Sequence, residues 1–172
     1  MYSLSQINRL CPAEFSLAFG AVYEHSPWIA ERAFALKPEG GFASRAAVHA
    51  ALVVTVQSAS EAEKLTLLNS HPELAGKEAA SGTLTSESTS EQASAGLTAM
   101  TAALVAELRE YNAAYREKFG FPFIIAVRNN TQQAIFAAVT SRLGNTRAME
   151  FNNNLMQVGE IARLRLLDIV ID

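Results

Sequence analysis

The sequence predicts an all-α protein, folded as a single-domain bundle of about eight helices. Side chains that favour helix starts precede most of the apolar stretches, and the apolar residues inside those stretches recur at helical spacing. Only residues 121–127 form a run that resembles a strand, so no multi-stranded sheet is expected. The chain has 172 residues and a hydrophobic content of 49%, which fits one domain with a sizeable core. We therefore expect one domain over residues 1–172.

Each helix expected in the first 70 residues begins at a recognisable signal. Two of the signals are capping boxes, in which a hydroxyl residue is followed three positions later by Glu or Gln. Another is a proline, which is tolerated in the first turn because its missing N–H has no helical partner there. The starts are Ser3 with Gln6, Pro12, Ser26-Pro27, Ser44, and Ser60 with Glu63.

The second half of the chain also has mostly helical patterns. A stretch composed almost entirely of Ser, Thr and Glu separates the helices of the first half from those that follow, and we interpret it as a loop. The apolar run near residue 121 is compatible with either a short strand or a buried extended link. The expected elements are a loop over residues 82–90, a helix over 91–119 closed by Gly120, the run 121–127, and helices over 131–144 and 145–169.

Composition argues against several classes of protein. The formal net charge is −3 and no dense Lys/Arg run is present, which argues against a nucleic-acid-binding protein. A single cysteine, Cys11, excludes an internal disulfide and fits a reducing compartment. No signal peptide and no apolar run of the ~20 residues that cross a bilayer are recognisable. His25 and His49 lack partners at zinc-ligand spacing, so no metal is expected. A cytoplasmic protein without a membrane is the expectation.

His71 is the first candidate for acid–base chemistry. Imidazole titrates near neutral pH, and the Pro72 that follows disfavours helical geometry at His71, so the preceding helix should end there. A ring at a helix end can face a cleft. The alternative is a surface or helix-capping histidine, which is a common role for this residue type.

Glu91 and Arg165 are the other two candidates. Glu91 is expected in the first turn of its helix, where it would either stabilise the helix dipole or help to bind a ligand. Arg165 falls on the apolar face of the last helix with Val158 and Ile161, whereas Arg163 points elsewhere. An arginine on an apolar face must be paired or reach water, and its planar fork also suits a carboxylate ligand.

Four motifs, taken in order along the chain, resemble the OHCU decarboxylase family. They are His71-Pro72-Glu73-Leu74-Ala75-Gly76, then Leu84-Thr85 through Ser88-x-x-Glu91-Gln92, then Lys118-Phe119-Gly120-Phe121-Pro122-Phe123-Ile124, and finally Ile161-Ala162-Arg163-Leu164-Arg165-Leu166. Glu73 stands where the family often has Asp, which keeps the charge. Enzymes of this family decarboxylate 2-oxo-4-hydroxy-4-carboxy-5-ureidoimidazoline (OHCU) to (S)-allantoin in urate breakdown.

The resemblance implies an all-helical carboxy-lyase of purine catabolism, usually a homodimer, with no metal or organic cofactor. It implies that His71 is the acid–base residue, with Glu91 and Arg165 as further catalytic residues. The small-molecule ureide substrate would be contacted by two stretches of chain and by the proline next to His71. The implied substrate-binding residues are Pro72, Ser88, Thr89, Ser90, Glu91, Gln92, Phe123, Ile124, Ile125, Ala126 and Val127.

Two other functions compete with this interpretation. A non-catalytic helical module that binds ureides or acts as an adaptor would use the same residues without turnover. A hydrolase acting on 5-hydroxyisourate would be expected to have an unrelated β-rich fold, and this sequence lacks the strand alternation that such a fold needs.

Overall fold

The computed structural model describes residues 1–171, with only the backbone described at 77 and 78. Within these residues it contains 10 α-helices, of which 8 have seven or more residues, and two very short strands. The predicted all-α fold with about eight helices is confirmed. None of the described helices is long and apolar enough to cross a membrane.

The chain divides into two compact units. The first contains Met1–Ser70 and the chain from Gly159 onward, and the second contains His71–Val158. Helix α10 (Arg147–Ile169) supplies residues to both units. The single domain expected over residues 1–172 stays a prediction.

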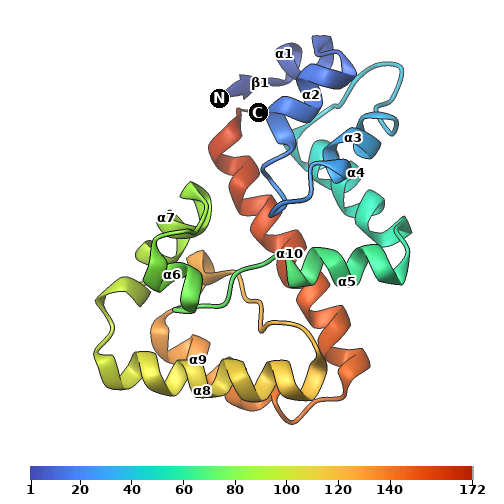
Figure 1. Ribbon diagram of the computed structural model, residues 1–172. Coiled ribbons are helices and arrows are strands. Elements are labelled where there is room, and N and C mark those ends of the chain that lie inside the picture. Colours follow the sequence, from blue (N-terminus) through green and yellow to red (C-terminus); the bar gives the residue numbers. More distant parts are fainter. Residues whose placement is uncertain (172) are drawn as a thin grey trace. The chain divides into compact units, whose positions relative to one another are not determined.

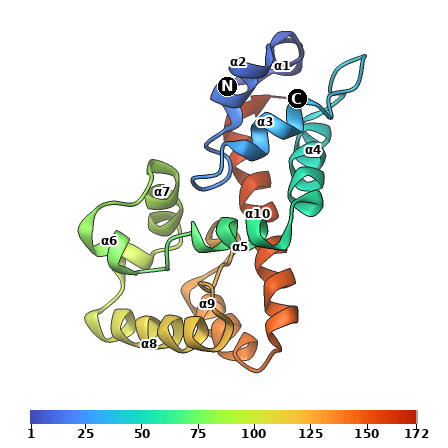
Figure 2. The same ribbon diagram turned by 45° about the vertical axis from the view of Figure 1, so that its right-hand side comes forward.

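The first unit is built around a cluster of phenylalanine side chains. Phe15 lies at the centre of the cluster, with ring centroids of Phe19, Phe34 and Phe42 at 4.5, 5.5 and 5.9 Å from its own. Helix α3 packs between α2 and α4, as Figure 2 shows. The elements are β1 Tyr2–Ser3, α1 Leu4–Arg9, α2 Pro12–Phe19, α3 Trp28–Phe34, α4 Arg45–Ser58, α5 Glu61–Asn69, the last part of α10, and β2 Val170–Ile171.

The helix starts of this unit follow the predicted capping signals. The Ser3 hydroxyl accepts the N–H of Gln6, and the Ser60 hydroxyl accepts the N–H of Glu63, so both capping boxes form. Pro12 is the first residue of α2, and Ser44 caps α4. These starts need only neighbouring residues, which is why the sequence predicts them.

The only sheet in the described part of the chain joins its two ends. Tyr2 pairs with Val170 in a parallel arrangement, and Figure 1 shows the ends side by side. Of the two alternatives that the sequence left open for residues 121–127, the structure shows the buried extended link over residues 121–126 and not a short strand. Pro122 has no N–H to donate, and the backbone groups of Ile124 and Ala126 bond to helix side chains instead of a second strand.

The second unit holds most of the predicted site. Its elements are α6 Lys77–Ser81, α7 Ser86–Ser94, the 3-10 helix η1 Leu97–Ala99, α8 Ala102–Phe119, the 3-10 helix η2 Val127–Asn129, α9 Gln132–Arg142, and the first part of α10. Helix α9 lies beside α8 in both views (Figures 1 and 2). Tyr115 is fully buried, and the rings of Phe119 and Phe123 lie 4.5 and 5.4 Å from it.

The single long helix predicted over residues 91–119 is wrong. Thr85 caps a separate helix, α7, by accepting the N–H of Ser88, so half of the expected loop 82–90 is helical. Gly96 then adopts a left-handed φ of 72° that ends the helical path, and Thr101 caps α8. Gly120 closes α8 in the left-handed conformation, as predicted.

Candidate active site

His71 follows helix α5 directly, at the place where the sequence predicts a helix end. Helix α5 stops at Asn69, and Ser70 is its C-cap. The side chain of His71 is only 7% exposed, whereas a histidine that merely caps a surface helix would be open to water. The His71 imidazole is therefore buried, although it lies at the start of a loop.

The loop after Pro72 is held by side chains from two helices. Ala75 has a left-handed φ of 50°, which is uncommon for a residue with a Cβ atom. Its N–H donates to Gln92 Oε1 of α7 at 3.1 Å, and its C=O accepts from Arg109 Nε of α8 at 3.0 Å. The C=O of Leu74 accepts from Asn112 Nδ2 of α8 at 2.9 Å. These bonds determine the path of the backbone just beyond His71.

Helix α7 carries the second group of predicted residues. Glu91 is the sixth residue of this helix, so the expectation that it lies in the first turn, beside the positive end of the dipole, is wrong. The physical reason is the cap at Thr85, which starts the helix well before Ser90. Ser88 and Gln92 are buried and Glu91 is half-buried, and Ser88 lies one helical turn before the other two. Thr89 and Ser90 are exposed.

The backbone of residues 122–126 makes hydrogen bonds in alternation. Ile124 donates its N–H to Asn154 Oδ1 at 3.2 Å, and its C=O accepts from Arg142 Nη1 at 2.8 Å. Pro122 and Ala126 are bonded on the same side, the first through its C=O to Asn154 Nδ2 at 2.8 Å and the second through its N–H to Gln157 Oε1 at 2.9 Å. A repeat of two is typical of an extended chain, whose successive residues face opposite ways.

Phe123 and Ile125, which lie between these positions, differ from their neighbours in their backbone hydrogen bonds. Within the described part of the chain, the backbone N–H and C=O of Phe123 and Ile125 make no hydrogen bond. Both residues are buried, at 1% and 7% exposure. Buried backbone groups are nearly always paired. The N–H and C=O groups of Phe123 and Ile125 are therefore suited to bind a ligand that has amide-like groups of its own.

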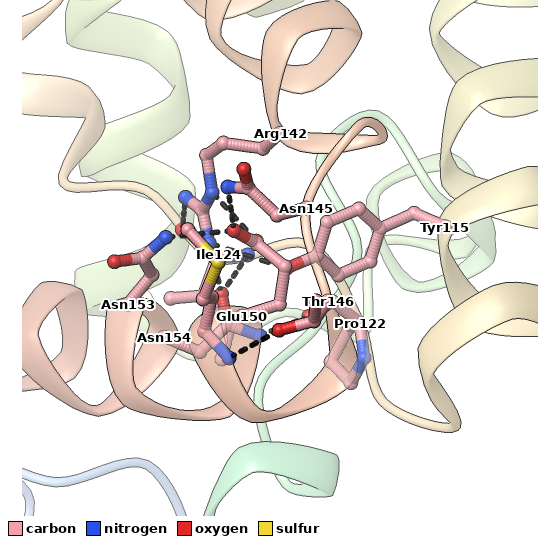
Figure 3. Close-up of polar contacts among 10 residues, drawn as sticks. Tyr115, Pro122, Ile124, Arg142, Asn145, Thr146, Glu150, Asn153 and Asn154 are labelled. Carbon is pink, nitrogen blue, oxygen red and sulfur yellow. Dashed lines mark hydrogen bonds and ion pairs between the residues drawn. The ribbon is translucent and has the colours of Figure 1, made fainter.

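A buried carboxylate, Glu150, holds the Arg142 side chain that bonds to the backbone of residues 122–126. Glu150 is 0% exposed and accepts hydrogen bonds from Arg142 Nε at 2.8 Å, from Asn145 and Asn153, both at 2.7 Å, and from the Tyr115 hydroxyl. Figure 3 shows these side chains converging on Glu150. Burial raises the pKa of Glu150, but its hydrogen bonds and the Arg142 charge outweigh burial and hold the pKa below its usual value. The carboxylate therefore stays charged and keeps Arg142 oriented.

Arg165 belongs to the first unit and faces inward, as the helical spacing predicts. It is 4% exposed, and its Nη1 donates to Glu24 Oε2 at 3.0 Å and to the carbonyl oxygens of Ala21 and Val22, both at 3.4 Å. Arg163 points outward and pairs with Glu160 at 2.8 Å. A structural ion pair, one of the two roles that the sequence left open for Arg165, is therefore present.

Comparison with known proteins shows the family to which the chain belongs. The sequence profile described as OHCU decarboxylase matches residues 8–167. The chain is 39% identical over 166 residues to the 2-oxo-4-hydroxy-4-carboxy-5-ureidoimidazoline decarboxylase of Haloferax volcanii, covering 96% of this chain and 95% of the relative. The chain belongs to the OHCU decarboxylase family.

Other relatives and solved structures extend the comparison. The decarboxylase of the same name from Amia calva is 36% identical over 167 residues, which are 97% of this chain and 94% of that one. A crystal structure of (S)-allantoin synthase has a TM-score of 0.77 and 29% identity; the match covers 99% of this chain but only 54% of that chain. A crystal structure of OHCU decarboxylase in the presence of (S)-allantoin, at 22% identity and a TM-score of 0.67 over 90% of this chain and 95% of that chain, has the same fold.

The structure adds polar residues that the sequence analysis of this family member missed. Asn112, Glu150 and Asn154 are buried on helices α8 and α10. A usable signal was present, because Glu150 and Asn154 continue the same helical face, in steps of three or four residues, as Val158, Ile161 and Arg165. The reasoning that singled out Arg165 as a polar residue on an apolar stripe applies equally to them.

A hollow elsewhere in the described residues lacks the predicted chemistry. A shallow, mostly apolar hollow in the first unit contains none of the predicted residues and only one carboxylate; it is lined by Pro12, Ala13, Ser16, Leu17, Pro27 and Glu31. Among the side chains that the structure describes, no group of three or more His, Cys, Asp or Glu residues is placed to hold a metal ion.

Proposed function

We propose that this chain is a carboxy-lyase that converts OHCU to (S)-allantoin in urate degradation, with a small-molecule ureide as substrate. Family membership over residues 8–167 is the observation that carries the proposal. The site supports it in two respects. A buried histidine follows a helix end, and residues 123 and 125 present an edge of buried backbone donors and acceptors that suits the N–H and C=O groups of a ureide.

The substrate itself can accept the electron pair that is released when CO₂ leaves. The bond from the ring to the carboxylate breaks and CO₂ leaves with no electrons from that bond. The electron pair delocalises into the adjacent unsaturated ureide system, and a proton is then added to one face of the ring carbon. The substrate hydroxyl loses a proton as the new C–H bond gains one, and one further proton from water neutralises the negative charge left when CO₂ departs, so protons and charge balance. Control over which face is protonated is the main task of the protein.

We assign His71 to one of these proton transfers, either removal of the hydroxyl proton or delivery of the new C–H proton. Glu91 orients His71 or accepts from the ureido N–H groups, and Arg165 anchors a carboxylate or ring oxygen through its planar fork. The remaining contacts come from Pro72, Ser88, Gln92 and the backbone of residues 123–127. Thr89 and Ser90, on the exposed side of α7, are also proposed to bind the substrate. Because they are exposed, replacing either with Ala should lower turnover less than replacing any other proposed residue.

The experiment replaces His71 with Asn and follows turnover by time-resolved circular dichroism on OHCU generated freshly from urate. His71→Asn should lower the enzyme-dependent rate of (S)-allantoin formation by at least about 100-fold, since a positioned acid–base residue contributes that much. The matched control is His25→Asn. His25 is exposed and has a left-handed φ of 48°, which Asn tolerates, so its replacement should leave turnover unchanged.

Thermal melting keeps the result interpretable, because His71 is buried and its loss can also affect folding. A folded His71→Asn variant that turns over substrate near the wild-type rate would refute the acid–base role. A wild-type protein that binds the ureide but produces no (S)-allantoin would instead favour the non-catalytic binding module.

We also propose a homodimer in the cytoplasm, as the family resemblance implies. The lone cysteine, Cys11, is exposed and free, which fits a reducing compartment. Light scattering on the purified chain tests the dimer, and fractionation of the source cells tests the location.

A further inference from the structure

We propose that Asn154 is a positioning residue, which holds the backbone of residues 122–126 so that Phe123 and Ile125 present their free N–H and C=O groups to the ureide. The inference rests on the proposed function and deepens it. Asn154 would act on the substrate only through this backbone, and none of the motifs shared with the family includes it.

One amide side chain, that of Asn154, joins three partners. Asn154 Oδ1 accepts from Ile124 N–H at 3.2 Å and from Arg142 Nη2 at 2.7 Å, while Nδ2 donates to the Pro122 C=O at 2.8 Å. Asn154 is fully buried, so no water replaces a lost partner. Its amide fits here because the contacts need both a donor and an acceptor on one short side chain.

Arg142 closes the same set of bonds. Its guanidinium reaches the Ile124 C=O, Asn154 and Glu150 at 2.8, 2.7 and 2.8 Å, as Figure 3 shows. The guanidinium also lies 4.7 Å from the centroid of the Phe123 ring. A rigid fork held by a charged, buried carboxylate therefore restrains Ile124 directly at its C=O and, through Asn154, at its N–H.

In an extended chain, fixing the backbone groups of residues 122, 124 and 126 on one side turns those of 123 and 125 to the other side. The helix side chains therefore decide both the direction and the spacing of the groups offered to the ligand. Misplacement of such groups by about 1 Å can cost about 100-fold in rate.

The test compares the neighbours Asn154 and Asn153 on α10. Asn154→Leu has similar volume but makes none of the three bonds, and Asn154→Asp keeps the acceptor while losing the donor to Pro122. Asn153 donates to Glu150 and has no hydrogen bond to residues 122–126, so Asn153→Ala removes a bond from the same polar cluster without releasing the segment. Steady-state kinetics on freshly generated OHCU gives kcat and KM, with melting temperature measured for each variant.

We expect Asn154→Leu to raise KM and to lower kcat/KM by about 30- to 100-fold. Asn154→Asp should be intermediate, and Asn153→Ala should keep KM within about twofold even where its melting temperature falls. A partly unfolded but otherwise normal enzyme would lose apparent kcat at unchanged KM. The split between KM and kcat therefore separates positioning from a merely structural role.

Unchanged KM in a folded Asn154→Leu variant would overturn the inference. If that variant does not fold, Gln157→Leu replaces it, since Gln157 is half-buried and holds the Ala126 N–H of the same segment. A KM that stays at the wild-type value in this replacement would likewise overturn it. Failure of the proposed function is distinct, because the wild-type protein itself would then show no decarboxylation.

Discussion

Replacing Arg165 with Lys tests whether an inward-facing guanidinium does more than stabilise the fold. The substitution keeps the positive charge but removes the planar fork. In the structure, Nη1 donates to Glu24 and to two backbone carbonyl groups, which orients the guanidinium. A Lys ammonium has no such plane and rotates about a flexible stem. A ligand that needs two parallel hydrogen bonds therefore loses one of them.

The size of the effect follows from these contacts. Loss of an oriented, charged contact to substrate costs about 2–4 kcal/mol, which lowers kcat/KM by ~30- to 1000-fold. Loss of the hydrogen bond between the charged groups of residues 165 and 24, whose side chains are 5% and 2% exposed, costs about 1.5–3 kcal/mol of folding free energy. For a chain of 172 residues this corresponds to a fall in melting temperature of about 3–12 °C.

Arg163→Lys is the matched control on the same helix. The Arg163 side chain is 44% exposed and pairs with Glu160, so its replacement should change kcat/KM less than about twofold. The assay is steady-state turnover of freshly generated OHCU, with thermal melting beside it. A lower melting temperature for Arg165→Lys at unchanged kcat/KM would show that Arg165 stabilises the fold through Glu24 and does not bind the substrate. A large loss in Arg163→Lys alone would show that the wrong arginine had been assigned.

Two further predictions concern stability. The pKa of Glu150 lies below its usual value of 4.5, so its charged form stabilises the fold above that pH and the contribution is lost as pH falls through the lowered pKa. The difference in melting temperature between wild type and Glu150→Gln should shrink between pH 7 and about pH 3; a constant difference would contradict this. Gly96→Ala should cost about 1–3 kcal/mol, because φ is 72° and the new Cβ would lie 3.1 Å from Gln132 Nε2; urea denaturation measures it, and an equally stable variant would refute the strain.

The sequence predicted most where neighbouring residues decide the outcome. The capping boxes at Ser3 and Ser60 are formed within four consecutive residues, and both appear in the structure. The inward direction of Arg165 and the outward direction of Arg163 follow from helical spacing alone. The same local reasoning failed at residues 82–90, since a polar composition indicated a loop although Thr85 can start a helix there.

Tertiary structure decided the rest of the site, because its bonds join residues far apart in the chain. Asn112 meets Leu74 across 38 positions, and Asn154 meets Ile124 across 30. No local pattern predicts which buried polar side chain will reach which carbonyl group, since that depends on how α8 and α10 pack. The sequence by itself determined the all-α class, the capped helix starts of the first unit and the choice of His71 as the acid–base candidate. Packing alone decided which backbone groups of residues 122–126 are bonded and which remain for a ligand.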